Sequence, residues 1–474
     1  MIRKNIYKWH RWVSILIAIP VIMWTVSGIM HPIMTSFKPK VKNQFIKPGT
    51  IDLSLITMPL KDALEMNEVS SISNFRIVKL KDSLYYQVKS KANNTPIYLN
   101  TQNGKTMRDA DRQYAAQLAR KFLGDSSKVL NIELVESFNK EYVYVNRLLP
   151  VYKVSFKRED SIRVYVDTFG DRMALAMDDN RYAFNRFFVS FHSWGFLDGL
   201  GNLRLFVLVL LSSLAFFTAI MGIYIWFLIR RKNKSNKTKY RRWHGQVAIF
   251  ASLTTLMFTF SGAFHAFKKF TPDNRLNYFY EPEIAASSLK PDLNKIVTLI
   301  PKDSIVNLSV VKMNEDIYWQ VIEKNGKGLS KSYVDAGQYT IFKNGEEAYA
   351  SFLANQFSGN SSGEISKQES IDKFTSEYGF VNKRLPVIKI QYSKNDNERY
   401  YVETSSGKLA AKIQDKDLTE GFSFAFLHKF HFMEFAGKTG RDAATVIAAA
   451  ATLLVTILGI TLFISFMVRK RKNV

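Results

Sequence analysis

The chain has 474 residues, a formal net charge of +25 and no cysteine. The absence of cysteine excludes disulfides, cysteine-ligated metals and covalently attached c-type haem, which needs Cys-x-x-Cys-His. A charge this positive is typical of nucleic-acid-binding proteins, but here the basic residues cluster in short segments beside apolar runs. The charge therefore indicates a membrane topology, and nucleic acid is excluded as a partner.

Four long apolar runs predict membrane-spanning helices in contact with membrane lipid, at 12–30, 205–229, 245–267 and 443–468. Each approaches or exceeds the roughly 20 residues that a helix needs to cross a bilayer. The segments 1–11, 230–242 and 469–474 are basic and carry no acidic residue, so the positive-inside rule places them in the cytoplasm. No small-residue cleavage site follows the first run, which predicts an uncleaved signal anchor.

Both termini and the middle turn are thus expected inside, and two long segments are expected outside. A bacterial inner membrane with periplasmic domains is the favoured location, and a Gram-positive cell surface stays open as an alternative. In the first half, the predicted division is 1–38 for the tail and first span, 39–190 for the first exterior domain, and 191–237 for the second span and cytoplasmic turn. In the second half, it is 238–267 for the third span, 268–427 for the second exterior domain, and 428–474 for the fourth span and tail.

The two exterior segments repeat each other. Glu-Tyr-Val-Tyr-Val-Asn-Arg-Leu-Leu-Pro-Val at 141–151 matches Glu-Tyr-Gly-Phe-Val-Asn-Lys-Arg-Leu-Pro-Val at 377–387, and Tyr-Val-Asp-Thr at 165–168 matches Tyr-Val-Glu-Thr at 401–404. Self-similarity at a long fixed period is typical of an internal duplication. Each half would hold a span, an exterior domain and a span in the same orientation, so we expect a pseudo-twofold axis along the membrane normal.

Within each exterior domain the pattern predicts two small α+β units. Helices are expected at 111–122 and 346–357, and alternating strands such as 151–156 follow them. Four strands are expected to end in a tight turn, at 98–100, 165–167, 333–335 and 401–403. The glycines after these strands are expected to supply a positive φ, and they are Gly104, Gly170, Gly337 and Gly407.

These features resemble the PepSY-associated transmembrane helix family over essentially the whole chain. The resemblance rests on Trp9-His10-Arg11-Trp12 at the first span, on the Ser-Gly pairs at 27–28 and 261–262, and on the exterior Tyr-Val-Asp/Glu strands. Family members include inner-membrane ferric and siderophore reductases that hold haem b. The resemblance therefore implies PepSY-like exterior domains and a haem-bearing membrane reductase.

All seven histidines lie in or beside the apolar runs, and the exterior domains contain none. Six of them match between the halves, as His10 with His244, His31 with His265, and His192 with His428. An imidazole inside a membrane is costly, which makes it a functional-site candidate. His10 and His31 are 21 residues apart, as are His244 and His265, so each pair would span about 31 Å on one side of a continuous helix.

The matched histidines are candidate axial ligands of haem b, which needs imidazoles, apolar walls and a cation near its propionates. His10 and His244 would hold an inner haem, with Arg11 and Arg242 near the propionates. On the outer side the symmetry allows two arrangements: His31 with His192 and His265 with His428, or His31 with His428 and His192 with His265. The 31 Å depth requires at least two haems. The competing interpretation is that these histidines only anchor helix ends at the membrane interface.

His431 has no counterpart, because Gly195 occupies the matching position. Together with His428 and Glu434 it follows helical spacing, and this is a weaker hypothesis for a zinc or iron site.

The cytoplasmic segments are too short for a flavin or nicotinamide domain, so electrons would come from membrane quinol or a separate donor. They would enter near His10 and His244, pass aromatic residues such as Trp24 and Trp226, and reduce an external ferric complex. The family resemblance implies that this complex is a ferric siderophore. The alternative is a non-redox membrane protein whose PepSY-like domains bind or regulate a periplasmic protease or an envelope ligand.

Overall fold

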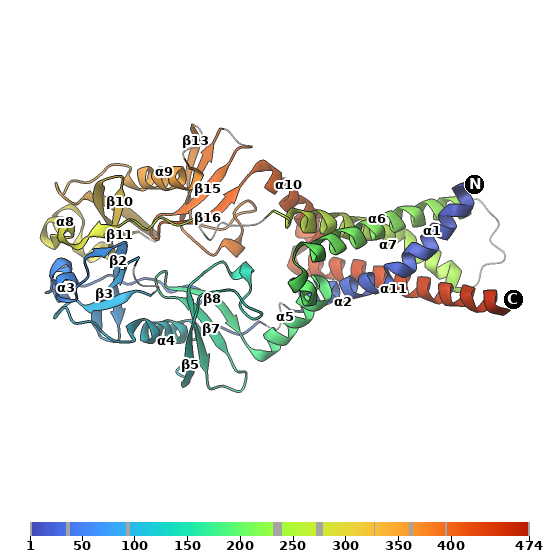
Figure 1. The fold of residues 1–474 in the computed structure, drawn as a ribbon, viewed down its shortest axis with the longest axis horizontal. Helices are drawn as coiled ribbons and strands as arrows, with labels where there is room; N and C mark the ends of the chain where they lie inside the picture. The colour runs from blue at the N-terminus through green and yellow to red at the C-terminus, as the bar shows by residue number, and fades with distance from the viewer. Residues whose placement is uncertain are drawn as a thin grey trace. The chain divides into compact units, whose positions relative to one another are not determined.

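The computed structural model describes residues 2–34, 38–91, 95–230, 239–271, 278–326, 328–359, 364–393 and 396–472. Its contacts divide the chain into two compact units. The first, which we call the helical unit, consists of Met1–Lys38, Asn180–Asp273 and Lys416–Val474. The second, which we call the sheet unit, consists of Pro39–Asp179 and Asn274–Asp415. Figure 1 shows the elements of both.

Long apolar helices make up the helical unit. They are α1 (Ile2–Leu16), α2 (Ala18–Met34), α6 (Asn202–Arg230), α7 (Lys239–Lys268) and α11 (Gly437–Lys472). Three of them, α6, α7 and α11, are each long and apolar enough to cross a membrane, and the pair α1 and α2 adds a fourth if it forms one span. The chain is therefore a multi-pass membrane protein, and the apolar runs at 205–229, 245–267 and 443–468 lie inside single helices as expected.

The first apolar run does not form one continuous helix. The axes of α1 and α2 differ by 57° across a break at Ile17. Pro20 explains the break, because proline lacks the N–H that would donate to the carbonyl of Leu16. The expectation that His10 and His31 share one side of a continuous helix is therefore wrong. In the second half Thr254 stands where Pro20 stands in the first, and α7 runs unbroken past His244 and His265.

The spans pack through small side chains. Helix α6 lies along α7, α11 lies along both α7 and α2, and α1 contacts α6 and α11 (Figure 1). Ala215, Ala251 and Ala448 are almost completely buried in these contacts, and Thr255 shares a hydrogen bond of 3.2 Å with Thr452 between α7 and α11. Small residues let helix backbones approach closely in the absence of a hydrophobic driving force.

Antiparallel sheets form the sheet unit. The first exterior segment contributes β2 (Asn74–Leu80), β3 (Ser83–Lys89) and β4 (Ile97–Asn100), then β5 (Val129–Val135), β6 (Val151–Phe156), β7 (Arg163–Asp167) and β8 (Arg172–Met177). The second segment repeats this as β10 (Ile305–Met313), β11 (Asp316–Asn325) and β12 (Gly328–Asp335), then β13 (Ile365–Ile371), β14 (Val387–Tyr392), β15 (Arg399–Glu403) and β16 (Lys408–Ile413). A short pair, β1 (Ser71–Ile72) with β9 (Ile284–Ala285), joins the two segments.

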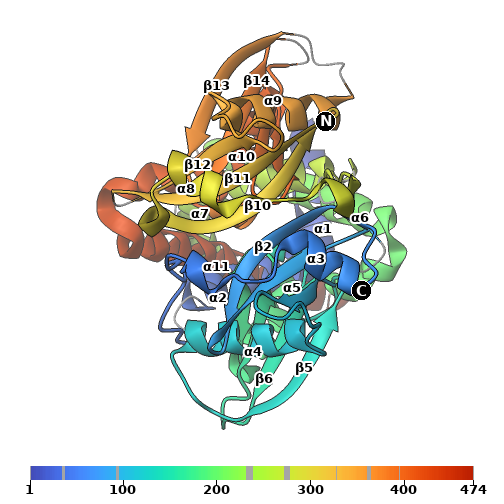
Figure 2. The same ribbon diagram turned by 90° about the vertical axis from the view of Figure 1, so that its left-hand side faces the viewer.

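Helices cover these sheets where the sequence predicts them. Helix α4 (Ala110–Leu123) contains the expected 111–122 and packs on β6 and β7, and α9 (Gly345–Ser358) contains 346–357 and packs on β14 and β15 (Figure 2). Their apolar faces are buried at Phe122 and Leu353. The short helices α3 (Leu60–Met66) and α8 (Leu293–Leu299) complete a core that both segments share, in which Phe75 meets Trp319 edge-on at 6.3 Å between ring centroids.

The strand-end turns use two different solutions. Gly104 and Gly407 adopt positive φ values of 69° and 63°, as expected. Gly170 and Gly337 do not, because an aspartate makes the turn instead. Asp167 Oδ1 accepts from the backbone N–H of Gly170 at 3.1 Å, and Asp335 Oδ1 accepts from that of Gly337 at 2.9 Å. An aspartate side chain can close such a turn without a left-handed glycine.

Candidate functional site

Six aromatic rings in the helical unit form a continuous series, which we call the ring row: His31, Phe188, His192, His428, Phe424 and His265. Its first half begins at His31 in α2, whose ring lies 5.3 Å from that of Phe188. Phe188 stacks on His192 at 4.6 Å, and both lie on α5 (Asp179–His192). Residues four apart share one face of a helix, which aligns these two rings.

The second half of the ring row repeats the first in reverse order. The rings of His192 and His428 meet edge to face, with centroids 5.9 Å apart. His428 then stacks on Phe424 at 4.8 Å, and Phe424 stacks on His265 of α7 at 4.6 Å. Phe424 and His428 form a single turn of π-helix (Phe424–His428), a wide turn that is frequent at functional sites.

Serines hold the two central histidines of the ring row. Ser27 Oγ lies 3.0 Å from His192 Nδ1, and Ser261 Oγ lies 3.0 Å from His428 Nδ1. These serines are the first residues of the two Ser-Gly pairs in the sequence.

The serine hydrogen bonds favour one tautomer of each imidazole. Ser27 Oγ lies 2.7 Å from the backbone carbonyl of Met23, and Ser261 Oγ lies 3.2 Å from that of Phe258. A hydroxyl has one proton, so a serine that donates it to the carbonyl can only accept from the Nδ1–H of its histidine. Nε2 then carries the lone pair in both rings, which is the form of histidine that binds a metal.

The ring row brings together different histidines from those that the sequence paired. His192 and His428, which were expected in separate pairs, are neighbours. Phe188 stands between His31 and His192, and Phe424 stands between His265 and His428. Sequence reasoning missed both phenylalanines, although each lies four residues before a histidine, a spacing that would have indicated a shared helix face.

Large aromatic rings flank the central pair symmetrically. Trp24 of α2 stacks on Trp194 at 5.7 Å, and at the matching positions Phe258 of α7 stacks on Phe430 at 5.3 Å. Trp194 and Phe430 both adopt a φ of 53°, so the same backbone turn follows His192 and His428. The ring of Phe258 also lies 5.5 Å from that of His428.

His10 and His244 form a second candidate site, which we call the glycine-lined site. A Cβ atom added to Gly222 of α6 would lie 3.4 Å from His10, and one added to Gly459 of α11 would lie 3.5 Å from His244. The two imidazoles are near enough to interact electrostatically. Each imidazole lies beside a backbone carbonyl, that of Thr218 for His10 and that of Val455 for His244. Among the described residues, neither buried Nδ1 atom makes a hydrogen bond of good geometry.

The two arginines expected near haem propionates have different surroundings. The guanidinium of Arg11 lies 3.8 Å above the ring of Phe466, which holds it against α11. Arg242 is exposed near the start of α7, and the neighbouring Trp243 is covered by the ammonium of Lys239 at 4.5 Å. Both arginines lie within two residues of a histidine of the glycine-lined site, but only Arg11 is held in place by a described contact.

The proposed metal site of His428, His431 and Glu434 is not formed. The π-helix ends at His428, Phe430 adopts a positive φ, and a separate 3₁₀ helix begins at His431. His428 and His431 therefore do not share a helix face, and His431 Nδ1 lies 3.0 Å from Glu434 Oε1 instead. Across the described ranges, no group of three or more histidine, aspartate or glutamate side chains converges in a way that could hold a metal ion.

The sheet unit buries a group of charges between its two segments. Glu403 is fully buried and forms ion pairs with Arg172 and Arg384, and these arginines hold the pKa of Glu403 well below its usual range. Lys383 donates to Asn146 at 3.1 Å, and Lys408 approaches the carbonyl of Leu149 at 3.5 Å. Burial lowers the pKa of both lysines to about 8.

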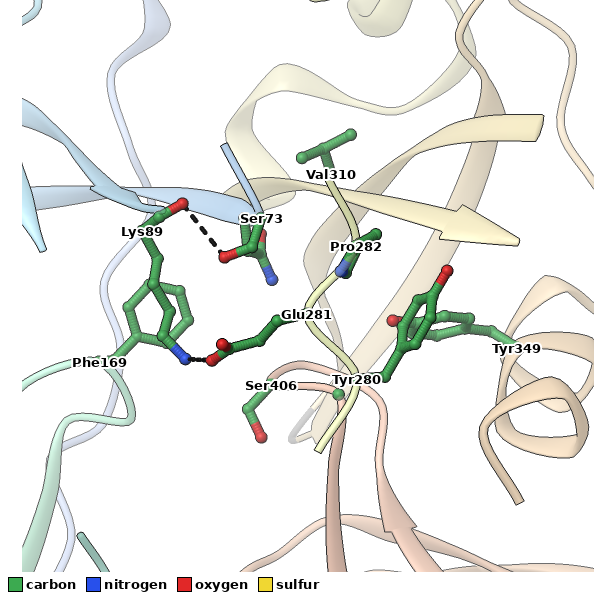
Figure 3. A pocket seen from close by; sticks show the side chains of 11 residues that line it. Ser73, Lys89, Phe169, Tyr280, Glu281, Pro282, Val310, Tyr349 and Ser406 are labelled. Carbon is green, nitrogen blue, oxygen red and sulfur yellow. Dashed lines mark hydrogen bonds and ion pairs between the residues drawn. The ribbon is translucent and has the colours of Figure 1, made fainter. Parts of the chain in front are cut away.

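A small cavity in the sheet unit is lined by Ser73, Lys89, Phe169, Tyr280, Glu281 and neighbouring residues (Figure 3). Lys89 and Glu281 close it with an ion pair. Its volume of about 10 Å³ leaves room for about one water molecule, so it is too small for a ferric chelate. A more open hollow of about 420 Å³ lies between Pro59, Lys61, Asp62, Lys290, Pro291 and Asp292.

Comparison with known proteins identifies the chain's family. The family model described as the PepSY-associated TM region matches residues 7–295, more than half of the chain. The matched part holds His10, His31, His192, His244 and His265, whereas His428 lies beyond it. No match is found among curated proteins. The chain therefore belongs to the PepSY-associated TM region family.

Proposed function

We propose that this protein is a transmembrane b-haem oxidoreductase that passes electrons outward to reduce a ferric complex outside the membrane, with ferric siderophores as the substrate class. The observation that carries the proposal is the state of the central histidines in the ring row. Ser27 Oγ and Ser261 Oγ each lie 3.0 Å from the Nδ1 of His192 and of His428. With Nδ1–H donating to the serine, Nε2 keeps the lone pair that a haem iron binds.

Two groups of residues could hold haem. The glycine-lined site offers His10 and His244, two imidazoles beside the smooth surfaces of Gly222 and Gly459. The ring row offers His192 and His428, and His31 and His265 stand one phenylalanine ring further out. Bound at these sites, haem b would supply a reversible one-electron carrier at each depth. We therefore propose at least two haems, with the ligand set His10, His31, His192, His244, His265 and His428.

The chain's own residues would prepare these sites in distinct ways. The serines fix the ring orientation and tautomer of the central histidines. Phe188 and Phe424 stack on those rings and exclude water from their faces. Arg11, held over Phe466, would supply a positive charge for a haem carboxylate at the glycine-lined site.

We also propose that the protein arose by internal duplication, with four spans and a pseudo-twofold axis along the membrane normal. Hydrogen-bond chains support this beyond sequence similarity. Gln87 Nε2 donates to the Tyr98 hydroxyl at 2.6 Å, which donates to Asp111 at 2.7 Å. At the matching positions, a chain of the same order joins Gln320, Tyr333 and Glu346 through two bonds of 2.6 Å. Two independent origins for such a buried chain would require a coincidence of three residue types.

The direction of electron flow follows from the proposed topology. We propose that both termini and the glycine-lined site lie at the cytoplasmic face of a bacterial inner membrane and the ring row at the periplasmic face, and the basic segments support this orientation. A membrane quinol or a separate donor would reduce the inner centre, because the cytoplasmic segments cannot form a flavin domain. The sheet unit would then lie in the periplasm, where it could receive a ferric chelate.

An optical spectrum of the purified full-length protein tests the proposal. Split α and β bands after reduction with dithionite are expected, with at least two haems per chain. His10→Ala, His244→Ala and His428→Ala are each expected to lower the haem-to-protein ratio, whereas His431→Ala serves as the matched control because His431 pairs with Glu434 outside both sites. A protein without visible absorption, or an unchanged ratio in all three variants, would overturn the redox function and favour a binding or regulatory protein.

A further inference from the structure

The two ends of the ring row are chemically different. His265 Nδ1 lies 2.6 Å from the carboxylate Oε1 of Glu420, on α10 (Asp415–Ser423). Glu420 is mostly buried, with about a fifth of its side chain exposed. The matching position in the first half, 236 residues earlier, is Phe184, which cannot accept a hydrogen bond. Within the described residues, no carboxylate forms an ion pair with His31 at the other end.

Cations lie near both ends of the ring row, so they do not by themselves distinguish the ends. His31 lies near the cations Lys429 and Arg181 and the anion Asp442. The ammonium of Lys429 also lies 5.1 Å from the ring centroid of Phe424, and Lys269 lies near Glu420. The difference between the ends is therefore the carboxylate that contacts the imidazole of His265 directly.

A carboxylate that accepts from Nδ1–H makes an imidazole a stronger electron donor to a metal bound at Nε2. A stronger donor stabilises the ferric state. Only the His265 end has such a carboxylate among the described residues. The centre at His265 would thus have the lower reduction potential.

We infer that Glu420 makes the two ends of the ring row unequal in potential, so that electrons pass from the second half of the protein to the first. This inference rests on the proposed haem function and assigns Glu420 as a positioning residue, which acts through His265. Haem held at the two ends would supply one-electron carriers, and Glu420 would act on the one held by His265 only through its contact with that imidazole.

Spectroelectrochemical titration of the haem-loaded full-length protein tests the inference. Glu420→Gln is expected to raise the lowest of the outer-haem reduction potentials by at least 59 mV. This shift corresponds to a tenfold change in the equilibrium constant of a one-electron couple. Glu420→Asp should restore most of the difference. The haem-to-protein ratio should stay unchanged, since the amide oxygen of glutamine can still accept from the Nδ1–H of His265.

A matched control separates the hydrogen bond from a general effect of charge. Asp417 lies on the same helix three residues before Glu420 and pairs with Lys268 at 3.7 Å, away from the imidazole. Asp417→Asn removes the same charge and is expected to shift the potential by much less. Equal shifts in Asp417→Asn and Glu420→Gln, or unchanged potentials in a Glu420→Gln protein that retains its haem, would overturn the inference and leave the haem function intact. A wild-type protein without haem would overturn both.

Discussion

Replacing Ser27 or Ser261 with alanine removes the acceptor that fixes the tautomer of a central histidine. The Nδ1–H of His192 or His428 would then lack a partner in largely enclosed surroundings, at a cost of about 1–3 kcal/mol. The imidazole could avoid this cost by rotating or by moving its proton to Nε2, and either change removes the lone pair from the position that a metal needs. Outer-shell partners of metal-binding histidines are worth about 10- to 100-fold in affinity, which agrees with this range.

The assay is the affinity of the purified protein for haem, followed by the Soret band as haem is titrated into protein stripped of it. Ser27→Ala and Ser261→Ala are each expected to weaken the outer sites by about 10- to 100-fold and to leave the glycine-lined site unchanged. Ser465→Ala is the matched control, because Ser465 makes the same bond to the carbonyl four residues earlier, 2.9 Å from Thr461, without touching a histidine. Outer-site affinities equal to wild type in both variants would refute the tautomer argument.

Two further predictions concern the glycine-lined site and the sheet unit. Gly222→Val and Gly459→Val should lower the content of the inner haem, because the valine side chains would reach the imidazoles of His10 and His244. Gly222→Ala should be tolerated, because its Cβ atom makes an ordinary contact at 3.4 Å. The haem-to-protein ratio measures both effects. Lys383 and Lys408 have their pKa lowered by burial from 10.5 to about 8, so the folded sheet unit binds fewer protons than the unfolded chain between about pH 8 and 10.5. Its stability should therefore rise with pH across that window, and Lys383→Met with Lys408→Met should flatten the rise in thermal denaturation followed by the fluorescence of Trp319.

The sequence was sufficient to predict elements whose signal is local and strong. Uninterrupted apolar runs predicted α6, α7 and α11, and the amphipathic stretches at 111–122 and 346–357 predicted α4 and α9. The bend between α1 and α2 was also encoded locally, in Pro20, but its effect on the alignment of His10 with His31 was overlooked. A regular 21-residue spacing suggests a continuous helix only where every backbone N–H in the run can donate.

The arrangement of the ring row could not be read from spacing, because it depends on the backbone between the helices. The π-turn at Phe424–His428 and the positive φ at Phe430 direct His428 toward Ser261 and His192, away from His431. The sequence gives no periodic signal for either feature. The Ser-Gly pairs were recognised as part of a family resemblance, and their contacts to histidine appear only once α2 meets α5 and α7 meets the π-turn.

A duplicated protein with identical halves would have no preferred direction across its pseudo-twofold axis, because equivalent centres would have equal potentials. The helical unit departs from this symmetry at a few positions. Pro20 bends the first span, whereas a threonine stands at the matching position of the second half. Glu420 contacts His265, whereas a phenylalanine stands at the matching position of the first half. The serines, the stacked phenylalanines and the glycines occur in both halves. The two halves therefore differ at residues that would set a haem reduction potential, and they agree at residues that would hold a haem. If the ring row were only structural, substitutions at Glu420 would be expected to affect stability, and a change in potential without loss of haem would separate the two explanations.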